Sequence, residues 1–145
     1  TMAITSAICN SFKQEILEAE HNFTASTGNT FNLALYDSDA TLNKSTTVYT
    51  TSEELATTGG YTAKGNALTS VTPTLDSDTA VCDFSNTSWT SASFTARGCL
   101  IFNDSHSSDA AVCAIDFGGD KTVTSGTFTV EFPAAAASTA IIQIA

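Results

Sequence analysis

The sequence has very few basic residues. Lys and Arg together number 5 against 15 Asp and Glu, and the formal net charge is −10 at pH 7. Proteins hold nucleic acids largely by neutralising phosphates with Lys and Arg, so this surface would repel a polyanion. An anionic membrane surface is disfavoured for the same reason, and no stretch approaches the roughly 18 apolar residues that a spanning helix needs. We therefore expect neither a nucleic acid nor a membrane as partner.

The residue types of common catalytic centres are also scarce. Only two histidines are present, His21 and His106, and no Gly-x-Ser-x-Gly motif accompanies either. Nucleophilic catalysis needs a Ser or Cys beside a His that an acid orients, whereas His106 lies in a very polar stretch that we predict to be an exposed loop. A pair of carboxylates for glycoside cleavage remains an alternative, because two such residues can be far apart in the sequence and adjacent only in the folded protein. We expect a non-enzymatic protein without a cofactor.

The cysteines do not have the spacing of a zinc site or of a disulfide scaffold. No CxxC pair occurs, and three of the cysteines lie inside short apolar runs. We expect four buried free thiols that pack as small hydrophobic side chains, the alternative being one disulfide between neighbouring strands. The residues concerned are Cys9, Cys82, Cys99 and Cys113.

Several acidic pairs flank predicted turns. Asp37, Asp39 and Asn43 have the spacing of a calcium loop, but glycine is missing at the sixth position and Val48 stands in place of the bidentate Glu. Asp and Ser favour turns because their side chains bond the local backbone. We therefore predict no metal site, with a weak surface cation site as the alternative. The other pairs are Asp76 with Asp78, Asp104 with Asp109, and Asp116 with Asp120.

The first part of the chain predicts one amphipathic helix. Residues 1–145 have the length of a single domain, which we divide into a helix at about 6–20 and a β-sandwich at about 30–145. Ile8, Phe12 and Ile16 recur at helical spacing after Ser6, a suitable N-cap. This stripe must pack on the chain's own sandwich or on a neighbouring subunit. We favour the subunit, which makes these three residues candidates for an interface.

From Thr30 the hydrophobic period changes to two, which predicts a half-buried strand at 31–36. Short β-branched and aromatic runs bounded by Ser, Thr, Asn, Asp and Gly follow, and Gly126 suggests a bulge or a hairpin. Residues 52–55 could form one helical turn. Eight or nine strands predict a mainly β fold, an antiparallel β-sandwich of jelly-roll or immunoglobulin-like type. Further strands are expected at 47–51, 67–72, 79–84, 89–96, 99–103, 110–117, 121–132 and 139–144.

Arg97 is the only arginine and separates two of these apolar runs. On so acidic a surface we expect it to pair with a carboxylate at a turn between strands. The alternative is a contact with another subunit, which makes Arg97 the fourth interface candidate.

Several segments resemble a family of small virion proteins of tailed bacteriophages, and the resemblance runs nearly from end to end. These segments are SFKQEIL (11–17), HNFT (21–24), FNLALY (31–36), GYT (60–62), ARGCLIFN (96–103) and DFGGDKT (116–122). The resemblance implies a structural protein of the virion, assembled in the cytoplasm of the host bacterium.

Within that family we expect a capsid decoration or cement protein. Its partners would be the major capsid protein or other virion proteins, and it would form a homo-oligomer, most commonly a trimer on local threefold axes. A tail or fibre component is the second interpretation, and a carbohydrate-binding module for the host surface is the third. Trp89, the single tryptophan, would be the natural residue for stacking on a sugar, but its alternation with small polar residues suits a core position equally well.

Overall fold

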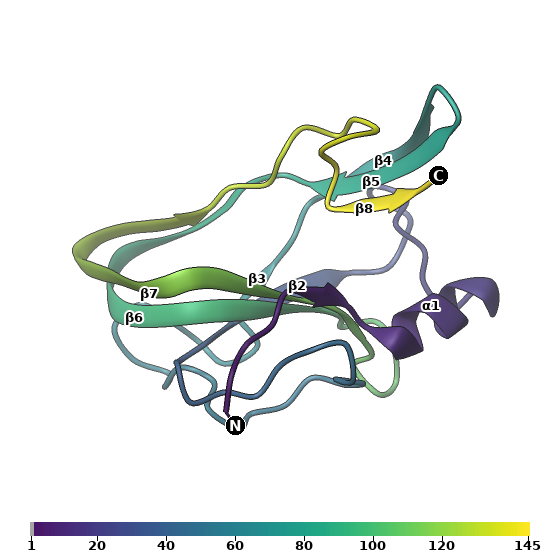
Figure 1. Cartoon of the computed structure of the whole chain (residues 1–145). Coiled ribbons are helices and arrows are strands. Elements are labelled where there is room, and N and C mark those ends of the chain that lie inside the picture. The colour runs from purple at the N-terminus through teal and green to yellow at the C-terminus, as the bar shows by residue number, and fades with distance from the viewer. Residues whose placement is uncertain (1) are drawn as a thin grey trace.

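A computed structural model describes residues 2–145 as a mainly β protein with two antiparallel sheets and one N-terminal helix. This confirms the predicted sandwich-like fold class. The five-stranded sheet has the order β1-β7-β6-β2-β3, and the three-stranded sheet has the order β4-β5-β8 (Figure 1). The first sheet contains β1 (Ala7–Ile8), β2 (Phe31–Tyr36), β3 (Asn66–Ala67), β6 (Thr87–Asn103) and β7 (Ala111–Val130). The second contains β4 (Ser70–Asp76), β5 (Thr79–Phe84) and β8 (Ile142–Ile144).

A long bent hairpin dominates the molecule. We predicted four strands over 89–132, but the residues form two, β6 of 17 residues and β7 of 20. The strands stay paired from Phe102↔Ala111 to Thr87↔Val130, with register shifts at four places. Such bulges bend a ribbon without ending its pairing, and Gly118 supplies a positive φ of 82° within one of them. Figure 1 shows the hairpin curving at one end of the molecule and rising toward the sheet of β4, β5 and β8.

The helix is shorter than predicted. Helix α1 covers Asn10–Leu17, and its N-cap is Cys9, whose side chain makes no capping hydrogen bond. The predicted start at Ser6 is wrong, because Ala7 and Ile8 pair with Ala114 and Cys113 of β7 and form strand β1 instead. Pairing with a sheet edge satisfies backbone groups that a helical start would leave open.

Strand β2 is buried on both faces, not on one as its alternation suggests. It lies between β6 and β3, and the connection formed by residues 37–65 lies against it. Two bonds fix that connection: the Leu55 N–H donates to the Leu35 carbonyl at 3.0 Å, and the Leu35 N–H donates to the Tyr61 hydroxyl, also at 3.0 Å. The predicted strand at 47–51 and the helical turn at 52–55 are both absent from this connection, which contributes isolated bridges at Val48 and Glu54 instead.

Of the remaining predicted strands, one has its predicted bounds and two differ from them. The strand at 79–84 is confirmed as β5, whereas 67–72 divides between β3 and β4, and 139–144 shortens to β8. Pro73 lies at the irregularity in β4 between Val71 and Thr74, which is consistent with an edge strand because proline cannot donate to a ladder.

A chain of aromatic rings joins the helix to the second sheet. Phe12 contacts Phe23, Phe23 stacks on Phe31 at a centroid distance of 4.2 Å, and Phe31 lies 5.9 Å from Phe84 of β5. All four rings belong to the hydrophobic core, as does Trp89, which is 4% exposed. Within residues 2–145, no helix is long and apolar enough to cross a membrane.

Candidate functional site

The helix stripe packs mainly on the chain's own core. Phe12 is 3% exposed, and Ile8 and Ile16 are half-buried against the core cluster. The expectation that the stripe docks on a neighbouring subunit is therefore wrong for Phe12, because its side chain is buried in the chain's own core. Ile8 belongs to β1 and not to the helix, because strand pairing begins before the helix does. The exposed apolar residue of α1 is Leu17, which is 88% exposed.

Arg97 has the expected carboxylate partner, but its position was predicted wrongly. It lies inside β6 and not at a turn, because residues 87–103 continue as one strand through a bulge. Its Nε donates to Oδ1 of Asp120 on the neighbouring strand β7 at 2.8 Å. Both side chains are about one third to one half exposed, at 35% and 50%. The pair is a cross-strand contact of the kind that stabilises a sheet by a few tenths of a kcal/mol up to about 1 kcal/mol.

The two histidines meet, although 85 positions separate them in the sequence. Their rings stack at a centroid distance of 6.1 Å, where the loop after β6 reaches the end of α1. His21 Nε2 lies 3.1 Å from Glu15 Oε1, and His106 Nε2 lies 2.7 Å from Glu20 Oε2. His21 is buried, and His106 is only 20% exposed in its side chain, so the prediction of an exposed loop is wrong for that ring.

Hydrogen bonds determine the tautomer of His21. Asn103 is completely buried, and its Oδ1 accepts from the Ser105 N–H at 3.0 Å, which orients the amide. Asn103 Nδ2 therefore donates to His21 Nδ1 at 3.0 Å, so the ring proton lies on Nε2 and is donated to Glu15.

In His106, as in His21, Nδ1 accepts a hydrogen bond and Nε2 donates one to a glutamate. The Ser108 N–H donates to His106 Nδ1 at 3.1 Å, so Nε2 carries the proton that it donates to Glu20. Glu15, Glu20 and His106 offer ligand atoms within 4.8 Å of one another, a spacing suited to a cation. A metal at His106 Nε2 would require the proton on Nδ1, directly against the Ser108 N–H. The geometry thus suits a contact that joins the loop after β6 to the segment following α1 better than a metal centre.

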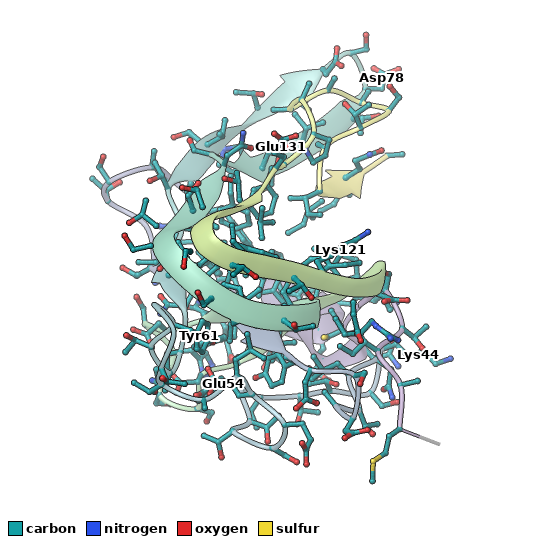
Figure 2. All side chains as sticks on the ribbon, turned by 90° about the vertical axis from the view of Figure 1, so that its left-hand side faces the viewer. Lys44, Glu54, Tyr61, Asp78, Lys121 and Glu131 are labelled. Carbon is teal, nitrogen blue, oxygen red and sulfur yellow. The ribbon has the colours of Figure 1, made fainter. Side chains whose placement is uncertain are left out.

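A second polar cluster surrounds Glu54. Its carboxylate accepts from the hydroxyl of Tyr49, from the hydroxyl of Tyr61 at 2.6 Å and from the Lys64 N–H at 2.7 Å. Figure 2 shows Glu54 and Tyr61 together beneath the long hairpin. Burial raises the pKa of Tyr49 and Tyr61 above the ordinary range, and the neighbouring Glu54 raises both further. Every oxygen of this carboxylate is used to hold the connection formed by residues 37–65.

The Lys64 side chain links this connection to the loop after β6. Its Nζ lies 2.9 Å from Asp104 Oδ1 and 2.8 Å from Asp109 Oδ2, and it sits over the rings of Tyr49 and Phe102. The two carboxylates raise the pKa of Lys64. Asp104 and Asp109, expected only to cap a turn, thus share one lysine.

One member of each of the other three predicted acidic pairs bonds the local or neighbouring backbone. Asp37 Oδ1 accepts from the Asp39 N–H at 2.9 Å, and Asp116 Oδ1 accepts from the Gly118 N–H at 3.0 Å. Asp37, Asp39 and Glu53 offer ligand atoms within 4.8 Å of one another, with two of the three residues exposed. Asp76 Oδ2 accepts from the Ala137 N–H at 2.7 Å.

The four cysteines are buried, as predicted, and each is a free thiol in the structure. Burial raises the pKa of Cys9 to about 11 and that of Cys82 to about 12. Cys99 and Cys113 are shifted in the same direction by the same cause. Because the thiolate is the reactive form, these thiols are inert near neutral pH.

The sequence did not predict an apolar hollow on the inner side of β7. Its volume is about 510 Å³, within the range of small-molecule sites. Half-buried phenylalanines dominate its wall, and one lysine and one glutamate line it as well. The two-residue period of β7 could have indicated which of its side chains share one face. It could not have indicated that the segment after β7 leaves the rings on that face partly exposed. The residues concerned are Ile115, Phe117, Lys121, Phe128, Thr129, Val130, Glu131, Phe132, Pro133 and Ile141.

Comparisons with protein-family models, with curated proteins and with solved structures return no match.

Proposed function

We propose that this chain is a non-enzymatic structural protein of a tailed-phage virion, acting as a capsid decoration or cement protein. One observation carries the proposal: the polar side chains that could do chemistry hold loops together. The His106–Glu20 contact holds the loop after β6 on the segment that follows α1, the His21–Glu15 contact holds that segment on the helix, and Glu54 fixes the connection formed by residues 37–65. A fold whose polar side chains hold its loops in place is suited to a structural role in an assembly. The resemblance of the sequence to small virion proteins supports the same role.

The two alternative functions differ in the structural features that support them. A tail component is the second candidate, because tail-tube subunits use long hairpins and the hairpin of β6 and β7 is long. That hairpin bends toward the chain's own second sheet of β4, β5 and β8 (Figure 1), which favours the decoration role. A carbohydrate-binding module has less support, since the single tryptophan, Trp89, is buried among Tyr61, Phe94 and Phe128 and cannot stack on a sugar.

The proposal is tested on purified virions of the phage that encodes the chain. Quantitative mass spectrometry should find it in a fixed ratio to the major capsid protein, set by the symmetry of the shell. Virions assembled without it should package DNA but release it at a lower temperature. Absence of the chain from virions would contradict the proposal, and a copy number matching the tail would favour the second candidate.

A further inference from the structure

We propose that the apolar hollow beside β7 is the contact surface between two copies of this chain. The inference rests on the proposed role as a homo-oligomeric structural protein and names the surface that such a role requires. It does not depend on where in a virion the protein is found.

The hollow is part of a larger apolar surface. Phe117, Phe128 and Phe132 line it and remain half-buried after the chain has folded. Ile115 and Ile141 line this hollow and also a second one of about 270 Å³, which reaches Ile8 of β1. One continuous surface therefore runs from the end of the long hairpin to the first strand. Ile8, an interface candidate from the sequence, lies at its margin.

This surface ends at two free strand edges. Among the described residues, β1 pairs only with β7, and β8 pairs only with β5, so the outer edge of each is open. Proteins cover or block open edges because unpaired N–H and C=O groups attract other strands. A second copy placed on the hollow would cover these edges together with the apolar wall.

The charges on the rim favour a second copy over another occupant. Lys121 and Glu131 both line the hollow, at separate places (Figure 2), and within residues 2–145 neither forms an ion pair. A surface that carries one positive and one negative charge complements a second copy of itself, with Lys121 of each copy facing Glu131 of the other. An apolar carboxylate would use the lysine and leave the glutamate uncompensated.

Charge reversal tests the pairing. The mass of the full-length chain is measured by sedimentation equilibrium from 1 to 200 μM in 0.15 M salt, where the Debye length is about 8 Å and long-range repulsion is screened. We expect reversible self-association that Lys121→Glu and Glu131→Lys each weaken about tenfold. The double variant restores both pairs and should associate within about threefold of the unmodified protein. Lys44→Glu and Asp78→Lys make the same charge changes at residues that line neither hollow (both labelled in Figure 2) and should leave association unchanged.

Other outcomes would overturn the inference. A protein that stays monomeric to 200 μM, or single reversals that the double variant does not rescue, would exclude this surface as the contact. Binding of octanoate to a monomer in a manner that requires Lys121 would identify the hollow as a small-molecule site instead. A monomer in solution combined with a shell location in the virion would refute this inference and leave the proposed function standing.

Discussion

Asp83 is a buried carboxylate that uses only part of its hydrogen-bonding capacity. The residue is 1% exposed, its Oδ1 accepts from the Phe84 N–H at 2.9 Å, and its Oδ2 has no partner among residues 2–145. Burial disfavours the charged form and raises its pKa above the ordinary value. The folded state thus retains a proton that the unfolded chain releases at about pH 4. Stability therefore falls as pH rises from that value through the pKa of the folded state.

The variant Asp83→Asn removes this dependence. We expect its free energy of unfolding to exceed that of the unmodified protein by an amount that grows as the pH rises above about 4 and levels off above the pKa of the folded state, at about 1.4 kcal/mol for each unit of pKa shift. Urea unfolding at several pH values measures the difference. A difference that stays constant with pH, or that reverses sign, would show that Asp83 is charged without penalty.

The three tyrosines predict how the protein responds to alkali. Burial raises the pKa of Tyr36, Tyr49 and Tyr61. Tyrosines in the unfolded chain ionise at about pH 10. The contribution of these tyrosines to the free energy of unfolding is therefore fully present below that pH and is lost as the pH rises above it. Ultraviolet titration should show all three phenols ionising in one step, together with the loss of far-ultraviolet circular dichroism. A tyrosine that ionises near pH 10 in the folded protein would contradict the buried cluster.

The cysteines give a further prediction at the residue scale. Because all four thiols are buried and free, a thiol reagent should react slowly with the folded protein near neutral pH. In denaturant without reductant it should find four thiols. A deficit of two would reveal a disulfide.

At the scale of elements, α1 completes the core and predicts a contrast between two of its residues. Phe12 is packed against His21 and Phe23, whereas Leu17 is 88% exposed. We expect Phe12→Ala to cost about 3–5 kcal/mol of unfolding free energy, and Leu17→Ala to change it by less than about 0.5 kcal/mol. Denaturant unfolding checks both. Equal, small effects would mean that the helix is a dispensable appendage.

The hydrophobic periodicity of the sequence predicted whether a segment is a helix or a strand better than it predicted the residues at which the segment begins and ends. Strand β5 was predicted with its bounds, because its short apolar run is bounded by turn-forming residues on both sides. The long hairpin was predicted in pieces, since Gly98 and Gly118 look like strand ends although they are bulges in continuous pairing. The helix was started too early because Ile8 fits a helical stripe and an edge strand equally well.

The candidate sites lay largely beyond the reach of sequence patterns. His21 meets His106, and Lys64 meets Asp104, only because the loop after β6 lies against both α1 and the connection beneath β2. No spacing along the chain encodes such contacts, since they depend on which loops share one end of the sandwich. The partner of Arg97 was foreseeable from the acidic composition, whereas its place within a strand was not.

At the scale of the whole molecule, two sheets enclose one core, and one apolar face remains uncovered. The histidine contacts fix the loop after β6 at the end of the sandwich where α1 lies, and Glu54 fixes the connection formed by residues 37–65, while the hollow beside β7 leaves three phenylalanines half-buried. In the role that we propose, this face would contact identical copies, and many such weak contacts, multiplied by symmetry, would stabilise a shell.

The most direct test of the proposed role is the position of the chain in the particle. Cryo-electron microscopy of the virion should show density of the size and outline of this sandwich at symmetry-related positions on the outside of the capsid, missing from particles assembled without the chain. Density confined to the tail, or identical capsids with and without the chain, would contradict the account.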